Sequence, residues 1–369
     1  MILFFDAVRQ WKEIGLSALS AIDRTGQAGK WILGDEVAAF EKNLGALLNL
    51  PRVISCASGL DALDMALRAS GLTANDKVLT TPLSAFATTL AILRVGAIPV
   101  FIDVDETGLV DLGLAKQILE ANPDIRFFVP VHLFGFPLNL PELDALIKMT
   151  GVTVIEDCAQ SIGAVFDGLS CGSIGIAGAF SFYPTKNIGA LGDGGAVATG
   201  DPRLAEAVFR MRDYGQSEKY SHVDYGFNSR LDELQASLLN KAILPRTKSW
   251  GARRKEIAEE YRAKITNPKL RQVKIAREAE PIWHIFPILV EKDRADFERH
   301  LTSQAIPYSR HYPRLITDQP FLLKCKHEIK TPLTSAEKMA NGEISLPIHP
   351  WLPKDEVDAI IQACNAWKN

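Results

Sequence analysis

A single lysine, Lys186, lies between an apolar segment that ends in hydroxyl residues and a glycine-rich turn. The preceding residues read Ala179-Phe180-Ser181-Phe182-Tyr183-Pro184-Thr185, and Gly192-Asp193-Gly194-Gly195 follows shortly after the lysine. Glycines admit close approach of the backbone, and an apolar neighbourhood desolvates an amine. A partly desolvated lysine loses its proton more readily and can form a Schiff base with a carbonyl compound. Most lone lysines are solvated surface residues, so this interpretation requires a complementary group.

Asp157 can supply the complementary acid. It follows the apolar run Val154-Ile155, and a carboxylate at a sheet edge is costly to desolvate unless it meets a cation. The alternative is an ordinary turn or helix-capping aspartate. Pyridoxal phosphate needs both groups, a lysine for its aldehyde and a carboxylate that keeps its ring nitrogen protonated. Lys186 and Asp157 together therefore predict a site for pyridoxal phosphate.

The phosphate and the ring of such a cofactor need further partners, and the sequence offers them after other strands. Ser181 ends the strand before Lys186, and Ser58-Gly59-Leu60 opens a helix whose N-terminus would favour an anion. Phe86 follows another strand and offers a flat face on which the ring could stack.

The elements that would position these residues are short apolar strands that alternate with helical patterns between about residues 51 and 201. The runs at 78–81, 98–102, 127–131 and 152–155 predict strands, and a helical pattern passes through Leu90, Leu93 and Val95. Continuous apolar strands separated by helices predict an α/β fold with a mostly parallel sheet covered on both faces. Such sheets bind ligands at the carboxyl ends of their strands.

The C-terminal part has a different pattern, which predicts a second and smaller α+β domain. We expect a large domain at 1–245 and a small one at 246–369, with a strand at 285–290 and helices at 293–303 and 355–367. The charge-rich stretch at 253–262 mixes both signs at helical spacing, and we interpret it as a solvated helix face.

Composition excludes several classes of protein. The chain has 369 residues, a formal net charge of -3 and 23% charged residues, which gives no reason to expect nucleic acid or an anionic membrane as partner. Five cysteines without paired spacing argue against a disulfide framework, and no uninterrupted membrane span or signal peptide is recognisable. We therefore expect a cytoplasmic enzyme, and no residue pattern predicts a metal site.

The chain resembles the DegT/DnrJ/EryC1/StrS family of sugar aminotransferases nearly from end to end. The resemblance is carried by Gly29-Lys30-Trp31-Ile32-Leu33-Gly34, Val131-His132-Leu133-Phe134-Gly135, Glu156-Asp157-Cys158-Ala159-Gln160, Ser181-Phe182-Tyr183-Pro184-Thr185-Lys186-Asn187 and Asn228-Ser229-Arg230-Leu231-Asp232-Glu233-Leu234-Gln235-Ala236. It implies an aspartate-aminotransferase-like fold, fold type I of the pyridoxal-phosphate enzymes. One departure is Ala57-Ser58-Gly59-Leu60, where the family often has Asn-Ser-Gly-Thr, so one hydroxyl contact to the phosphate is missing. Some relatives have histidine in place of the lysine and catalyse deoxygenation; Lys186 argues against that branch.

The resemblance also implies roles for individual residues. Lys186 and Asp157 would be catalytic, and the cofactor would be held by Ser58, Gly59, Leu60, Phe86, Asp157, Gln160, Ser181, Lys186 and, from the neighbouring subunit, Asn228. The expected substrate-binding residues are Tyr183, Lys219, Arg230, His311 and Tyr312. Lys219 would neutralise a diphosphate, Arg230 would bind the carboxylate of the amino donor, and His311 with Tyr312 would line a hexose pocket. A homodimer with shared active sites follows.

The C-terminal half is similar to enzymes that aminate carbon 3 of a dTDP-linked 3-keto-6-deoxyhexose. Trp283-His284-Ile285-Phe286, His311-Tyr312-Pro313 and Ser345-Leu346-Pro347-Ile348 carry this similarity, whereas Arg314-Leu315-Ile316 departs from it. The implied reaction exchanges an amino group in two stages, first from L-glutamate, which leaves as 2-oxoglutarate, and then to the keto sugar. The product would serve a surface polysaccharide, such as the O-antigen of lipopolysaccharide, or a glycosylated natural product. The alternatives are amination of carbon 4, a UDP-linked 3-keto sugar as substrate, a non-catalytic sensor on the same fold, or a simple nucleotide-binding module.

Overall fold

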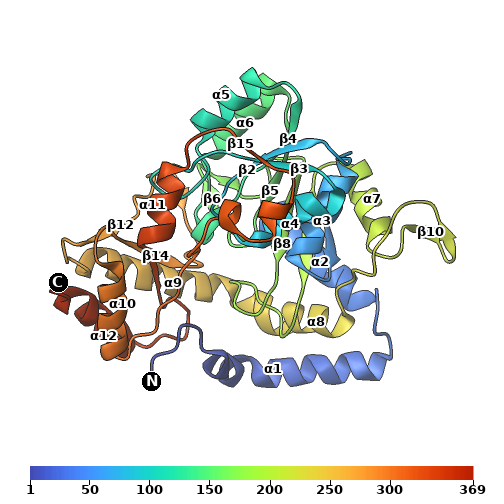
Figure 1. Ribbon diagram of the computed structural model, residues 1–369. Helices are drawn as coiled ribbons and strands as arrows, with labels where there is room; N and C mark the ends of the chain where they lie inside the picture. Colours follow the sequence, from blue (N-terminus) through green and yellow to red (C-terminus); the bar gives the residue numbers. More distant parts are fainter. Residues whose placement is uncertain (369) are drawn as a thin grey trace.

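The computed structural model describes residues 1–368 and is built around one eight-stranded sheet (Figure 1). The strand order is β1-β9-β8-β5-β4-β2-β3-β15. The bounds are β1 Arg52–Cys56, β2 Lys77–Thr80, β3 Ile98–Phe101, β4 Ile125–Val129, β5 Thr153–Asp157, β8 Ala177–Ser181, β9 Gly195–Thr199 and β15 Glu328–Ile329. Only β9 runs antiparallel to its neighbours β1 and β8. The predicted strands and the mostly parallel sheet are confirmed.

The strands form because their residues are buried on both faces of the sheet. Phe127 packs in one hydrophobic cluster and its neighbour Phe128 in another, and the same alternation separates Val154 from Ile155. Successive side chains of a strand point to opposite faces, so both faces of the sheet are covered. The continuous apolar runs of the sequence follow from this double burial.

Helices connect the strands and cover the sheet (Figure 1). They are α1 Ala7–Ala28, α2 Asp35–Leu48, α3 Gly59–Ala69, α4 Phe86–Val95, α5 Leu112–Ala121, α6 Leu140–Thr150, α7 Pro202–Met211 and α8 Glu233–Leu238. Several begin at a capping side chain that accepts a backbone N–H of the first turn, as Asp111, Asn139 and Asp201 do. Short strands complete this part of the chain: β6 Val165–Phe166, β7 Leu169–Ser170, and the β10 Gln216–Glu218 and β11 Ser221–His222 hairpin.

The C-terminal part contains a three-stranded antiparallel sheet of order β12-β14-β16. Its elements are α9 Thr247–Lys264, β12 Leu270–Gln272, β13 Ala279–Glu280, β14 Phe286–Val290, α10 Arg294–Ser303, α11 Thr334–Gly342, β16 Glu343–Leu346 and α12 Lys354–Ala366. The strand and the two helices predicted here are confirmed to within one residue at each end.

The interpretation of residues 253–262 as a solvated face is wrong for Arg254. This side chain is buried, and its Nη1 donates hydrogen bonds to the carbonyl oxygens of Trp283 at 3.1 Å and Ile348 at 2.6 Å. Charges at helical spacing do not distinguish a solvated arginine from a buried one. A guanidinium has five donors and can be buried where several carbonyl groups accept its hydrogen bonds.

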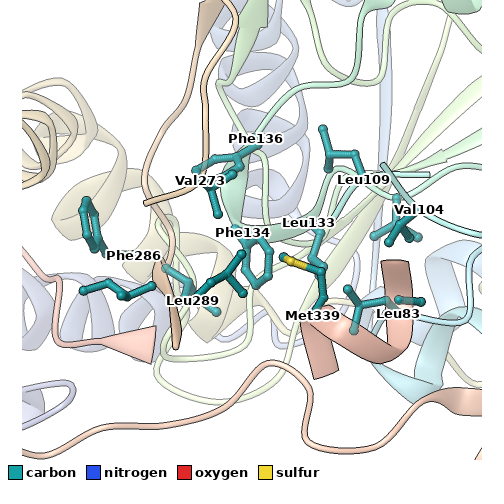
Figure 2. Close-up of a cluster of buried hydrophobic side chains, with 14 of the residues drawn as sticks. Leu83, Val104, Leu109, Leu133, Phe134, Phe136, Val273, Phe286, Leu289 and Met339 are labelled. Atoms are coloured by element: carbon teal, nitrogen blue, oxygen red, sulfur yellow. The ribbon is translucent and has the colours of Figure 1, made fainter. Parts of the chain in front are cut away.

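A hydrophobic core crosses the predicted boundary at residue 245 (Figure 2). In this cluster Leu83 and Leu109, from the first half of the chain, pack with Phe286, Leu289 and Met339 from the last third. In addition, β15 pairs with β3 at the edge of the central sheet. The division at 245 remains a prediction. Among the helices of residues 1–368, none combines the length and apolarity needed to cross a bilayer.

Candidate active site

Two neighbouring strands of the central sheet end beside each other at the residues that matter most. β5 ends at Asp157 and pairs in parallel with β8. Asp157 lies opposite Ala179, and β8 continues for two more residues to Ser181. The chain then turns through residues 182–190, where the N–H of Lys186 donates to the carbonyl of Tyr183 at 2.8 Å. The sheet edge predicted to carry the chemistry therefore brings Asp157, Ser181 and Lys186 together.

Lys186 has an unusual electrostatic environment. Desolvation lowers the pKa of its amine to about 8, while the nearby carboxylate of Asp157 acts in the opposite direction. Because a neutral amine is the nucleophile toward a carbonyl, this shift makes a reactive form available close to neutral pH. The burial that the apolar strand and the glycines predicted is thus the cause of the shift.

Asp157 is a buried carboxylate held by two donors. The hydroxyl of Thr88 donates to Oδ2 at 2.7 Å, and the N–H of Ala159 donates to Oδ1 at 3.1 Å. Burial nevertheless raises the pKa of Asp157, although these hydrogen bonds and the charge of Lys186 lower it. A further cation at this carboxylate, such as a protonated ring nitrogen, would offset the desolvation.

The start of α3 provides an anion site next to Ser181. Ser58 is the N-cap, and its hydroxyl accepts the N–H of Asp61 at 3.1 Å, whereas the N–H groups of the first helical residues, Gly59 and Leu60, have no partner within the helix. A Cβ on Gly59 would lie 2.7 Å from the Cβ of Ser181, so the helix start approaches the strand end as closely as glycine permits. Two N–H groups and a hydroxyl are suitable ligands for a phosphate.

Gln160 is fixed between the sheet and the C-terminal part. Its Oε1 accepts the N–H of Phe134 at 2.7 Å, and its Nε2 donates to the hydroxyl of Tyr312 at 3.1 Å. His311, the preceding residue, is close enough to Lys186 for the charge of that amine to help lower the pKa of the imidazole to about 4, although burial is the larger cause. The predicted hexose residues therefore belong to the same site as the lysine.

The other predicted site residues differ in their surroundings. Lys219 lies in the turn of the β10–β11 hairpin, which projects from the body of the protein in Figure 1, and its side chain is exposed. Asn228 and Tyr183 are also exposed. Arg230 forms an ion pair with Asp213 at 2.5 Å. Phe86 begins α4 and contacts the ring of Phe321 edge-on at 6.2 Å.

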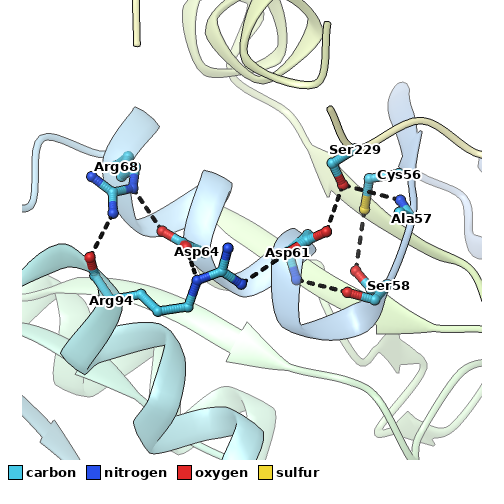
Figure 3. A network of polar contacts seen from close by, with 8 residues as sticks. All are labelled: Cys56, Ala57, Ser58, Asp61, Asp64, Arg68, Arg94 and Ser229. Carbon is cyan, nitrogen blue, oxygen red and sulfur yellow. Dashed lines mark hydrogen bonds and ion pairs between the residues drawn. The ribbon is translucent and has the colours of Figure 1, made fainter. Parts of the chain in front are cut away.

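The loop that carries Asn228 is attached to the anion site through its next residue (Figure 3). The hydroxyl of Ser229 donates to Asp61 of α3 at 2.7 Å and accepts the N–H of Ala57 at 3.1 Å. Asp61 is also paired with Arg94, at 2.9 Å. Because Asp61 lies in the first turn of α3, the loop and the phosphate-binding helix start are parts of one polar network.

A buried group of His132, Glu156 and Cys158 has ligand atoms within 4.8 Å of one another, which is compatible with a metal site on distance alone. However, Nε2 of His132 donates to Glu156 at 2.9 Å, and its Nδ1 accepts the N–H of Leu138 at 3.1 Å. An imidazole with both nitrogens engaged has no lone pair for a metal ion. Burial acts to raise the pKa of Glu156, but His132 and backbone N–H groups lower it overall. The group is therefore a structural network.

Three residues around the centre were given no site role by the sequence analysis. Thr88 supports Asp157 from α4, and Oδ1 of Asn187, the residue after Lys186, accepts a hydrogen bond from Nδ1 of His284 at 3.0 Å. Burial, followed by the charge of Lys186, lowers the pKa of His284 well below its ordinary value. No local pattern identifies these contacts, because each partner comes from a distant part of the chain.

Comparisons with known proteins agree with this geometry. Residues 13–365 match the model of the DegT/DnrJ/EryC1/StrS aminotransferase family. The dTDP-3-amino-3,4,6-trideoxy-alpha-D-glucose transaminase of Streptomyces venezuelae is 36% identical over 99% of this chain and 95% of its own. The UDP-N-acetyl-3-dehydro-alpha-D-glucosamine 3-aminotransferase of Acidithiobacillus ferrooxidans is 34% identical over 93% of this chain and 91% of its own.

The crystal structure of Streptomyces venezuelae DesV in complex with a ketimine intermediate superposes with a TM-score of 0.94 at 35% identity, covering 99% of this chain and 98% of that one. The helix-covered sheet, the reactive lysine beside a buried carboxylate and the match over nearly the whole chain lead to one conclusion. The protein belongs to the DegT/DnrJ/EryC1/StrS aminotransferase family and is a pyridoxal-phosphate-dependent aminotransferase.

Proposed function

We propose that this enzyme transfers the amino group of L-glutamate to carbon 3 of a dTDP-linked 3-keto-6-deoxyhexose. The observation that carries the proposal is the position of His311 and Tyr312 close to Lys186. Tyr312 accepts a hydrogen bond from Gln160, and His311 is near enough to Lys186 for the charge of the lysine to help lower the pKa of the imidazole. They are among the residues that carry the resemblance to dTDP-sugar 3-aminotransferases, and the Streptomyces venezuelae relative bears the name of a dTDP-3-amino sugar transaminase.

The residues of the site fit pyridoxal phosphate. When bound, the cofactor supplies an aldehyde for the amine of Lys186 and an electron sink for the carbanion of the substrate. Ser181 and the N–H groups of Gly59 and Leu60 would hold its phosphate, with the hydroxyl of Ser58 alongside. Asp157 would pair with the ring nitrogen. Phe86 would stack on the ring and Gln160 would contact its hydroxyl, in positions that the resemblance implies.

The chain's own part in the chemistry is proton transfer at Nζ of Lys186. In the first half-reaction the neutral amine takes the α-proton of L-glutamate, and 2-oxoglutarate leaves. In the second half-reaction the ammonium returns a proton to carbon 3 of the sugar. An amine with a pKa of about 8 is suited to both directions, because neither protonation state is strongly disfavoured near neutral pH.

Substrate recognition would involve groups on both sides of the centre. Tyr183 is exposed next to the strand end and could contact the sugar or the donor. Arg230 would bind the donor carboxylate after exchanging its present partner Asp213, and Lys219 would neutralise the diphosphate. The phenol of Tyr312, whose pKa burial raises, stays protonated and can donate a hydrogen bond to the hexose.

We further propose a homodimer in which Asn228 of one subunit reaches the phosphate of the other. Asn228 is exposed, and α1 presents apolar side chains to solvent, among them Val8, Trp11 and Leu19. The test is co-expression of Lys186→Ala and Asn228→Ala subunits under separate affinity tags. Mixed dimers contain one site with both residues intact, so purified mixed dimers should regain activity that neither parent has. Inactive mixed dimers would contradict sharing of the sites.

The substrate is tested by product regiochemistry. The holoenzyme is incubated with L-glutamate and, in parallel, with dTDP-linked 3-keto, dTDP-linked 4-keto and UDP-linked 3-keto sugars, and the new carbon–nitrogen bond is located by NMR. Amination at carbon 3 of the dTDP sugar supports the proposal. The Acidithiobacillus ferrooxidans relative favours a UDP-linked 3-keto sugar as the second candidate, which exclusive turnover of that substrate would establish.

A holoenzyme whose absorbance does not respond to L-glutamate or to any of the sugars would favour a sensor. If the dTDP-linked amino sugar is formed, we expect it to be made in the cytoplasm and used as a building block of O-antigen or another surface glycan.

A further inference from the structure

His311 is held on three sides by the protein. Its backbone N–H donates to Oε2 of Glu343 at 2.7 Å, its Nδ1 is 2.8 Å from the hydroxyl of Ser345, and the ring of Phe4 stacks on it at 6.1 Å between centroids. Ser345 is fixed in turn, because its backbone exchanges two hydrogen bonds with Ser309, at 2.9 and 3.1 Å. The imidazole therefore has a set position and a set partner.

The polarity of this arrangement follows from Glu343. The hydroxyl of Ser345 donates to Oε1 of Glu343, since an ionised carboxylate can only accept. A hydroxyl has a single proton, so Ser345 must accept from Nδ1 of His311 rather than donate to it. The imidazole then has its proton on Nδ1 and a lone pair on Nε2.

We propose that Glu343, acting through Ser345, fixes His311 with its proton on Nδ1 and so presents Nε2 to the sugar as a hydrogen-bond acceptor. Glu343 and Ser345 are positioning residues, and the group they select is a sugar hydroxyl, which can donate to Nε2. Only this assignment of the ligand rests on the proposed function; the tautomer is a property of the protein alone.

Glu343 makes the tautomer dependent on pH. Burial raises the pKa of its carboxyl to about 7, against the hydrogen bonds from Ser345 and the backbone of His311 and against the charge of Arg310. The pKa of Arg310 is influenced in turn by Arg294 and Glu298 of α10 and by Tyr308. Tyr312 and His311 are further titratable groups near Glu343. In the neighbouring strand β14, the residue opposite Glu343 is Leu289, which carries no charge.

A protonated Glu343 reverses the chain of hydrogen bonds. Its O–H can donate to Ser345, whose hydroxyl is then free to donate to Nδ1 of His311, and the imidazole proton moves to Nε2. The ring itself stays neutral, because the pKa of His311 is lowered to about 4. Nε2 of His311 therefore offers the sugar a hydrogen-bond donor below about pH 7 and a hydrogen-bond acceptor above it.

The variant Glu343→Gln should lock the reversed state. The single oxygen of glutamine must accept the buried N–H of His311, since an unpaired backbone donor is costly. Its amide group then donates to Ser345, which donates to Nδ1. Exposed Glu337 of α11 supplies a matched control, Glu337→Gln, which should change nothing.

The measurement is NMR of the holoenzyme labelled with nitrogen-15 histidine, with the His311 signals identified by their loss in His311→Asn. At about pH 8.5 we expect the proton on Nδ1, and at about pH 5.5 in wild type, or at any pH in Glu343→Gln, on Nε2. A proton on Nε2 at high pH, or a tautomer insensitive to both pH and Glu343→Gln, would overturn the proposal. The wild-type titration decides the question even if the variant does not fold.

Kinetics test the ligand separately. Glu343→Gln should raise KM for the keto sugar by about tenfold or more, because two donors would face each other, and should leave the half-reaction with L-glutamate unchanged. An unchanged KM would refute the role of Nε2 in sugar binding. If none of the tested keto sugars is a substrate, the proposed function fails while the tautomer result stands, so the two failures are distinguishable.

Discussion

Replacing Thr88 with valine should impair the chemistry without disturbing the shape of the site. Valine has nearly the same volume but cannot donate to Oδ2 of Asp157, which Thr88 does at 2.7 Å. A hydrogen bond to a charged group contributes about 1.5–3 kcal/mol. If the carboxylate form of Asp157 is needed in the transition state, this loss corresponds to a roughly ten- to hundredfold slower reaction.

The adjacent Thr89 is a close control. Both threonines are fully buried in α4, but the hydroxyl of Thr89 has no hydrogen-bond partner within the part of the chain that the structure describes. Thr89→Val removes a buried unpaired hydroxyl and should leave activity near the wild-type value. The pair of variants therefore separates loss of the bond to Asp157 from a general effect of valine in this helix.

The assay is the single-turnover reaction of the holoenzyme with L-glutamate, followed by the visible absorbance of the cofactor. We expect a lower rate constant in Thr88→Val and an unchanged one in Thr89→Val. A Thr88→Val rate constant within about twofold of wild type would refute the assigned role of the hydrogen bond. Equal impairment in both variants would attribute the effect to packing of α4.

Three further predictions concern the lysine, the buried arginine and the anion site. The rate of cofactor uptake by the apoprotein should rise as the pH passes through about 8 and then level off, because the neutral amine of Lys186 is dominant only above its pKa of about 8. A rate that does not change with pH in a rapid-mixing absorbance experiment would contradict this prediction. Arg254→Met should lower the free energy of unfolding, measured by urea denaturation, by about 2–5 kcal/mol, because it leaves buried carbonyl groups unpaired. The control Lys255→Met, on the exposed side of the same helix, should change this free energy by less than about 0.5 kcal/mol. Gly59→Ala should weaken pyridoxal phosphate binding about tenfold or more in a spectroscopic titration, because a Cβ would lie 2.7 Å from the side chain that ends β8; Gly200→Ala, where a Cβ has open space, should not.

The sequence sufficed for the features that depend on local pattern. Buried parallel strands give continuous apolar runs, so the strands and the edge where Asp157 and Lys186 meet could be predicted. Resemblance added His311 and Tyr312, which the structure places at the same centre.

Contacts between distant segments could not be predicted in this way. Thr88 lies 69 residues from its partner Asp157, and Glu343 lies 32 residues from His311. Arg254 is a further case, since its charged neighbours predict a solvated face and only the fold brings carbonyl groups around it. In each case the side chain is chosen by what surrounds it in space, and a single sequence has no periodicity that records such surroundings.

The hydrophobic cluster that joins the first half of the chain to the last third has a consequence for enzyme engineering. Leu83 and Leu109 share it with Phe286, Leu289 and Met339, so the two parts pack together as one unit. Exchanging residues 246–369 for those of a relative, in order to transfer its sugar preference, would mismatch these side chains and leave cavities or clashes. A productive chimaera must carry both sides of the cluster from the same parent, or confine the exchange to residues that line the pocket.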